Sequence, residues 1–143
     1  MEILVIENNT EIFSDLEKCL SLYKSDFGLV SCVSGTQCLV DIATNNKNPK
    51  LLIIGINPSC RKNVLYLVAQ IRDYSDIPIV VLSYDNNINT LVSYFDAGIN
   101  NFISYPYNKE IFVALLKAVI RRRKWDTQKP ILSKLLTNSQ PVE

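Results

Sequence analysis

The position that would carry chemistry in this sequence is occupied by a glycine. Residues 51–56 form an apolar run closed by Asn57 and Pro58, which is typical of a central strand buried on both faces of a parallel sheet. In open α/β sheets, ligands and reacting groups gather just beyond the carboxyl ends of the strands. That position falls on Gly55, or on Ile54 if the register slips by one residue. Neither side chain can act as a nucleophile, a base or a metal ligand.

Other residue types that supply catalysis or metal binding are scarce. The chain has no histidine, which removes His-based acid–base catalysis and most zinc sites. The four cysteines show neither a CxxC pair nor metal-ligand spacing, so we expect them to fill the core in a reducing compartment. They are Cys19, Cys32, Cys38 and Cys60. Since glycine-rich phosphate-binding motifs are also lacking, we predict a protein that is not an enzyme and has no metal and no cofactor.

Length and composition indicate one cytoplasmic domain. A chain of 143 residues is long enough to bury a core of its own. Its formal net charge of +1 gives no general electrostatic reason to bind nucleic acid or anionic lipid. No stretch approaches the roughly 18 to 20 apolar residues that cross a bilayer, and the amino terminus lacks the features of a signal peptide. We therefore expect a cytoplasmic location and no membrane partner.

The rest of the chain is predicted to alternate strands and helices, which would position the residues around Gly55. We expect strands at 3–6, 29–33, 51–56, 77–82 and 101–104, and a chain break at 26–28. We expect helices near 12–22, 34–43, 62–72, 88–97 and 108–124, the second and last of them capped by Ser34 and Asn108. Such alternation predicts a parallel sheet with helices on both faces. The strand order 2-1-3-4-5 of the flavodoxin-like group suits the count.

Five stretches of the chain, in order, carry a resemblance to a known family. They are residues 3–9, the strand ending near Pro58, and residues 77–83, 96–103 and 105–107. From Ile3 to Lys124 the chain resembles the CheY-like receiver domain of bacterial response regulators, most closely the OmpR/PhoB type. The resemblance implies a doubly wound (βα)5 fold in residues 1–125. Residues 126–143 would be a polar tail or the start of a linker to an effector domain.

The resemblance also implies a phosphorylation site, which is degenerate here. Receivers hold Mg²⁺ with an acidic pair, phosphorylate an aspartate, and contact the phosphoryl group with a lysine that precedes a proline. The matching positions hold Glu7 with Asn8, Gly55 and Tyr105. A hard cation needs several oxygen ligands, and phosphoryl transfer needs an acceptor and a positive charge. The sequence therefore predicts a pseudo-receiver that is not phosphorylated.

Two positions that respond to phosphorylation in receivers are kept. They are Ser83, at the end of a strand, and the aromatic switch residue Phe102. We interpret the Ser83 hydroxyl as a strand-end group that bonds to the backbone. The resemblance further implies a cis peptide bond between Tyr105 and Pro106.

A dimer face is the third implication of the resemblance. In the OmpR/PhoB type it joins the helix at 88–97, the strand at 101–104 and the last helix, with an apolar cluster inside a rim of ion pairs. The matching residues are Leu91, Val92, Phe95, Asn101, Ile111, Ala114, Leu115 and Ala118. Apolar or neutral residues thus replace the rim charges. A buried Leu or Ile contributes about 1.5–3 kcal/mol, against about 0–1 kcal/mol for an exposed ion pair.

The last helix has more apolar surface than its own core needs. Phe112, Leu116 and Val119 already supply a core stripe. We therefore expect Leu91, Ile111 and Leu115 to be surplus to the core and exposed, as in an interface.

These observations predict a phosphorylation-independent receiver that acts as a constitutive homodimer in transcription regulation. DNA would be contacted only through an effector domain missing from this chain, because the basic run at 121–124 is typical of a helix carboxyl terminus. The alternatives are a monomeric protein-docking module that uses the same face, and a sensor of a small ligand in the vacated acidic pocket.

Overall fold

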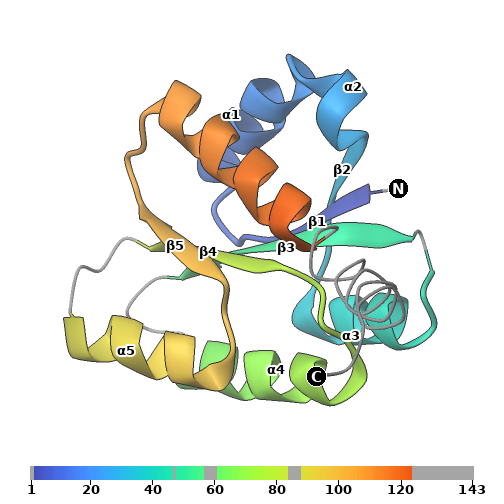
Figure 1. The fold of residues 1–143 in the computed structure, drawn as a ribbon, viewed down its shortest axis with the longest axis vertical. Coiled ribbons are helices and arrows are strands. Elements are labelled where there is room, and N and C mark those ends of the chain that lie inside the picture. Colours follow the sequence, from blue (N-terminus) through green and yellow to red (C-terminus); the bar gives the residue numbers. More distant parts are fainter. Residues whose placement is uncertain (1, 47, 57–60, 84–87, 124–143) are drawn as a thin grey trace, which may run out of the picture.

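A computed structural model of the chain describes residues 2–46, 48–56, 61–83 and 88–123 (Figure 1). One parallel sheet has the strand order β2-β1-β3-β4-β5. Its strands are β1 (Glu2–Ile6), β2 (Leu29–Cys32), β3 (Pro49–Ile56), β4 (Ile79–Ser83) and β5 (Asn101–Ser104). The helices are α1 (Thr10–Ser21), α2 (Lys24–Phe27), α3 (Gly35–Ala43), α4 (Arg61–Tyr74), α5 (Ile88–Ala97) and a last helix at 109–123. The predicted doubly wound fold is confirmed.

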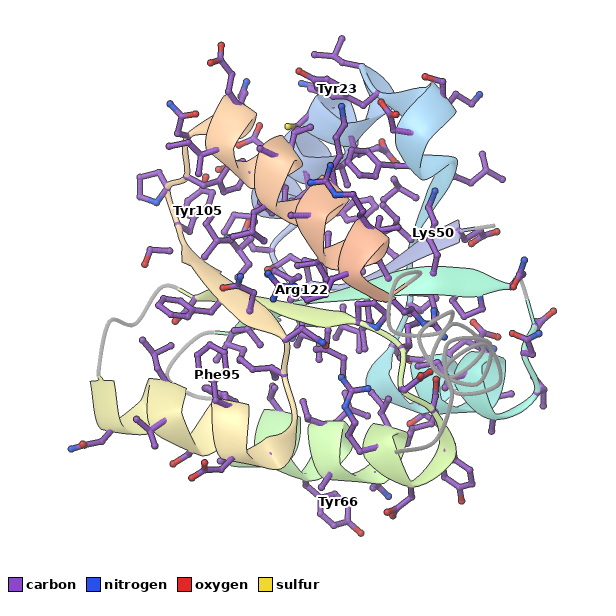
Figure 2. The ribbon with its side chains drawn as sticks, viewed as in Figure 1. Tyr23, Lys50, Tyr66, Phe95, Tyr105 and Arg122 are labelled. Carbon is purple, nitrogen blue, oxygen red and sulfur yellow. The ribbon has the colours of Figure 1, made fainter. Side chains whose placement is uncertain are left out.

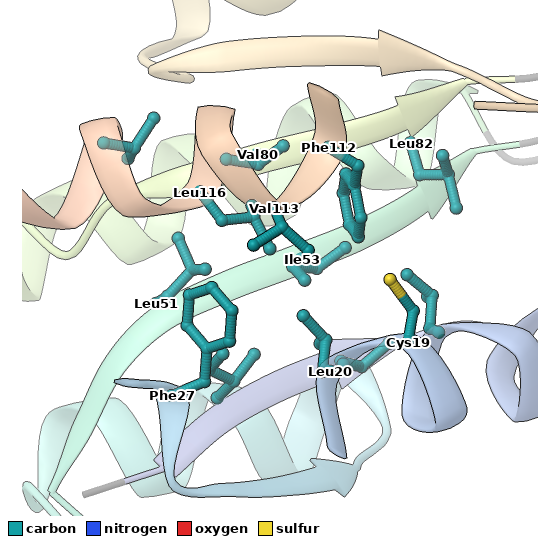
Figure 3. Close-up of a cluster of buried hydrophobic side chains, with 14 of the residues drawn as sticks. Cys19, Leu20, Phe27, Leu51, Ile53, Val80, Leu82, Phe112, Val113 and Leu116 are labelled. Carbon is teal, nitrogen blue, oxygen red and sulfur yellow. The ribbon is translucent and has the colours of Figure 1, made fainter. Parts of the chain in front are cut away.

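The helices form two layers with the sheet between them. In Figure 1, α1, α2 and the last helix lie on one side of the sheet, and α3, α4 and α5 lie on the other. Strand β3 serves both layers: Leu51 and Ile53 belong to the cluster beneath the last helix (Figure 3), whereas Leu52 and Ile54 belong to the cluster beneath α4. This two-sided burial explains why β3 is a continuous apolar run.

Side-chain caps start three of the helices. Asn9 Oδ1 accepts from the backbone amides of Glu11 and Ile12 at the start of α1. Ser34 Oγ accepts from the Gln37 amide, and Asn108 Oδ1 accepts from the Ile111 amide, as the sequence predicted for both helices. Each cap satisfies a backbone donor that the first helical turn leaves open.

Arg72 determines where β4 begins. Its Nη1 donates to Ile77 O at 2.7 Å, its Nε donates to Gly98 O at 2.9 Å, and its Nη2 donates to Asn100 Oδ1 at 2.9 Å. The predicted strand began at Ile77, but the carbonyl of that residue is used by Arg72 and the ladder starts at Ile79. The guanidinium thereby joins the segments that precede β4 and β5.

Two other predictions are corrected. The first two residues of the expected break at 26–28 belong to the short helix α2, whose last residue Phe27 is fully buried, and the chain turns only at Gly28 with φ 74°. Cys32 is exposed at the end of the edge strand β2, whereas Cys19 and Cys38 are buried as expected. Burial, with a smaller contribution from Asp41, raises the pKa of Cys38 to about 12, so this thiol is inert.

Some predictions fall outside the described residues. They concern Cys60, the loop at 57–58 and the tail at 126–143. Within the described residues, no helix is long and apolar enough to cross a membrane.

Candidate functional site

The sheet brings most of the predicted site residues to one edge. Ile6 pairs with Ile54, and Gly55 and Ile56 pair with Leu82 and Ser83, so the carboxyl ends of β1, β3 and β4 lie side by side. The Tyr105 amide donates to Ser83 O at 2.9 Å, which holds the segment after β5 against the end of β4. Ser83 is buried. The same region at this edge of the sheet is therefore bordered by Glu7, Gly55, Ser83 and Tyr105, as the resemblance implies.

The carboxylate of Glu7 fills the space above Gly55. A Cβ atom added to Gly55 would lie 2.6 Å from Glu7 Cδ and would overlap Glu7 Oε2. The other carboxylate oxygen, Oε1, accepts a hydrogen bond from the Asn9 amide at 3.0 Å. Any side chain at position 55 would thus have to displace Glu7 from this arrangement.

The contact between Glu7 and Gly55 was not predicted from the sequence, in which Glu7 was interpreted as the remnant of a metal-binding pair. The signal was the combination of two residue types, a glycine at 55 and a glutamate rather than a shorter aspartate at 7. The absent side chain makes room for the additional methylene.

The donor set does not fit Mg²⁺. This cation demands near-octahedral oxygen coordination, usually with carboxylates and phosphate oxygens among its ligands. The residues that follow β1 offer one carboxylate, on Glu7, and one amide oxygen, on Asn8. Among the described residues, no group of three or more His, Cys, Asp or Glu side chains could hold a metal ion.

Tyr105 occupies the position where receivers carry a lysine. The Tyr105–Pro106 peptide bond is cis, as predicted. The ring of Tyr105 (Figure 2) meets Tyr107 edge-on at 5.9 Å between centroids, and Tyr107 packs on Phe112 at 4.5 Å. The contacting rings of Tyr105, Tyr107 and Phe112 therefore form an aromatic column that links this loop to the core under the last helix.

Tyr107 adds a buried hydroxyl to that column. The hydroxyl oxygen has no hydrogen-bond partner among the described residues. Burial raises the pKa of Tyr107, and Cys19, Asp15 and Tyr105 raise it further, so the group stays protonated. An unsatisfied buried donor costs about 1–3 kcal/mol.

We expect Tyr107→Phe to stabilise the protein by about 1 kcal/mol, because it removes the unsatisfied hydroxyl and keeps the ring. Urea unfolding followed by circular dichroism measures the change. Tyr66→Phe is the control, since Tyr66 is an exposed tyrosine on α4 (Figure 2) and should leave stability unchanged. A less stable Tyr107→Phe protein would mean that the hydroxyl is hydrogen-bonded.

The predicted dimer face carries exposed apolar side chains on two helices. Val92 and Phe95 on α5 are 53% and 42% exposed, and Ile111 on the last helix is 63% exposed. Phe102, which is half-buried, meets Phe95 edge-on at 6.0 Å between centroids. The switch aromatic and the candidate face are therefore in direct contact.

Apart from Ala114, the other members of the predicted face are half-buried. Leu91 and Ala118 are half-buried, and Ala114 is exposed. Leu115 is half-buried because it packs against the cluster beneath the last helix. Asn101 Oδ1 accepts from the amide of Phe102 at 2.8 Å, so this side chain is turned back to its own strand. The apolar side chains of the predicted face that remain most exposed are Val92 and Phe95 on α5 and Ile111 on the last helix.

Comparison with known proteins gives the family. No protein-family model matches the chain. The transcriptional regulatory protein PrrA of Mycobacterium tuberculosis is 29% identical over 121 residues, which cover 85% of this chain and 50% of PrrA. The sensory transduction protein BceR of Halalkalibacterium halodurans is 30% identical over 122 residues, with coverage of 85% and 50%. The chain is a response-regulator receiver domain.

The structural comparison agrees. The structure of HP1043, an orphan response regulator of H. pylori, superposes on this receiver with a TM-score of 0.67 and 26% sequence identity, covering 84% of this chain and 96% of that one. The receiver spans about half the length of the curated relatives it matches. Its relatives are of the OmpR/PhoB type, as the resemblance indicated.

Proposed function

We propose that this receiver works without phosphorylation, as a constitutive homodimer that regulates transcription in the cytosol through an effector domain outside the described chain. The observation that carries the proposal is the Glu7 carboxylate in the space above Gly55. The names of relatives such as PrrA support a role in transcription. DNA contact would belong to the effector domain, and the receiver itself would catalyse no reaction.

The first part of the proposal, that this receiver is not phosphorylated, follows from the residue types at the carboxyl edge of the sheet. An acyl phosphate forms on a carboxylate, and Gly55 has none. The carboxylate at hand, on Glu7, is engaged by the Asn9 amide, and the second metal-binding position of receivers holds Asn8 rather than an acidic residue. Negative charge in the vacated space also disfavours the approach of a phosphodonor.

We expect acetyl phosphate with Mg²⁺ to leave the intact mass of this receiver unchanged. A receiver with a complete acidic site, treated in parallel, shows that the reagent is active. A stoichiometric gain of one phosphoryl group, mapped to an aspartate or glutamate, would contradict the proposal.

The second part of the proposal, constitutive dimerisation, rests on the surface formed by α5, β5 and the last helix. Val92, Phe95 and Ile111 expose apolar area there, whereas a phosphorylation-controlled face would need a weaker, switchable contact. Because each of these side chains is only about half exposed, full burial by a partner gains roughly half of the about 1.5–3 kcal/mol that a fully exposed one would gain. A two-fold axis would bring each patch against its own copy.

Light scattering across a concentration series tests the assembly directly. We expect a dimer at micromolar concentration with no phosphodonor present. A monomer at all concentrations would contradict constitutive dimerisation and favour the alternative in which the same face docks a different protein.

A further inference from the structure

A cavity of about 380 Å³ lies between α3 and α4, at the carboxyl edge of the sheet. Among the described residues, none that lines the cavity carries a formal charge, and the nearest carboxylate is that of Glu7, against Gly55. One part of the wall is polar and is formed by Asn8, Ser34, Thr36, Asn63 and Gln70. The remainder is aliphatic side chains and the glycines at 35 and 55.

The cavity occupies the place where this topology favours ligand binding. The chain runs from β1 outward to β2 and then returns to β3 on the other side of β1. In open α/β sheets, the crevice at such a switch point, outside the carboxyl ends of the strands, is where ligands bind. Asn8 follows β1 and Gly55 lies near the end of β3, so both ends of the switch point border the cavity. Gly55 contributes only backbone to this border.

The polar side chains around the cavity keep hydrogen-bonding capacity for a ligand. In the part of the chain that the structure describes, the side chains of Asn8, Thr36, Asn63 and Gln70 make no hydrogen bond. Ser34 Oγ accepts from the Gln37 amide at 3.1 Å and can still donate its proton. Their amide and hydroxyl groups are therefore available to a ligand.

The aliphatic part of the wall is only partly covered. Ile6, Leu39 and Leu67 pack at the margin of the cluster beneath α4, yet each keeps part of its surface open. An apolar wall combined with a few convergent polar groups is the usual lining of a small-molecule site. Such a wall can take the flat face of a ring.

We propose that this cavity binds an uncharged nucleoside. An Asn or Gln amide both donates and accepts, and can pair with the edge of a nucleobase. The hydroxyls of Ser34 and Thr36 complement those of a sugar. Because no described residue of the lining is a cation that could pair with a phosphate, and the Glu7 carboxylate beside Gly55 would repel one, a nucleotide would bind less well. The proposal goes beyond the proposed function and does not depend on dimerisation.

Isothermal titration calorimetry of the full 143-residue chain with adenosine, with uridine and with AMP tests the proposal. We expect saturable one-to-one binding of at least one nucleoside, and AMP binding at least about tenfold weaker than adenosine if adenosine is the ligand. Failure of both nucleosides to bind up to about 5 mM would overturn it. Tighter binding of AMP than of either nucleoside would also overturn it, since an anionic ligand would then be preferred.

Two variants place the binding in this cavity. Thr36→Phe fills it from the first turn of α3 and should weaken nucleoside binding at least about tenfold, and Gln70→Leu removes one amide at similar volume and should weaken it several-fold. Val40→Phe is the matched control, because Val40 is exposed on the same helix and does not line the cavity. Unchanged binding in both Thr36→Phe and Gln70→Leu would overturn the assignment. Light scattering without nucleoside reports separately on the proposed dimer.

Discussion

Gly55→Asp is expected to lower the free energy of unfolding by about 1–3 kcal/mol, although it restores the residue type that receivers phosphorylate. The new Cβ overlaps the Glu7 carboxylate, so Glu7 must leave its hydrogen bond to the Asn9 amide. Two carboxylates then lie close together, and like charges at short range disfavour the ionised pair. Urea unfolding at pH 7 measures the loss.

Matched variants separate the steric effect from the electrostatic one. Gly55→Ala adds the Cβ without the charge and should retain only the steric part of the loss. Glu7→Ala combined with Gly55→Asp should recover about 1–2 kcal/mol relative to Gly55→Asp alone, because the two sites are in contact. We also expect Mg²⁺ to stabilise Gly55→Asp but not the unaltered protein, since only the variant has two adjacent carboxylates. Strictly additive effects would show that Glu7 does not occupy this space.

Ile111→Asp is expected to convert the proposed dimer into a monomer. Each copy would place a carboxylate in an apolar contact, and a two-fold axis applies that cost twice. Burying an unpaired charge costs several kcal/mol, which corresponds to a rise in the dissociation constant of at least about 100-fold. Sedimentation velocity across a concentration series measures the shift.

The fold of Ile111→Asp should be intact, because the Ile111 side chain is 63% exposed and lies off the core stripe. Circular dichroism checks this directly. Tyr66→Asp is the matched control: Tyr66 is 68% exposed, but it lies on α4, which is not part of the proposed face. A dimer that survives Ile111→Asp would place the interface elsewhere, and dissociation by both substitutions would indicate a nonspecific effect of charge.

The sequence by itself determined the order of the elements and most of their boundaries. Continuous apolar runs such as residues 51–54 specify strands buried on both faces, since neither face of a central strand meets water. Helix starts at Ser34 and Asn108 were readable because capping is a local hydrogen bond between near neighbours. The replacement of the receiver aspartate by Gly55 and of the receiver lysine by Tyr105 could also be recognised from the sequence, because each is a single residue at a fixed place in the family pattern.

Only the tertiary structure shows which side chains occupy the space left by the receiver residues that this chain lacks. Glu7 and Gly55 lie 48 residues apart in the chain, and their contact depends on the register between β1 and β3 and on one side-chain rotamer. Leu115 was expected to be exposed with Ile111, yet the packing of the last helix half-buries it. The cavity between α3 and α4 exists only because two helices and two strand ends meet there. Periodicity and caps are properties of neighbouring residues, whereas these features depend on how distant side chains share space.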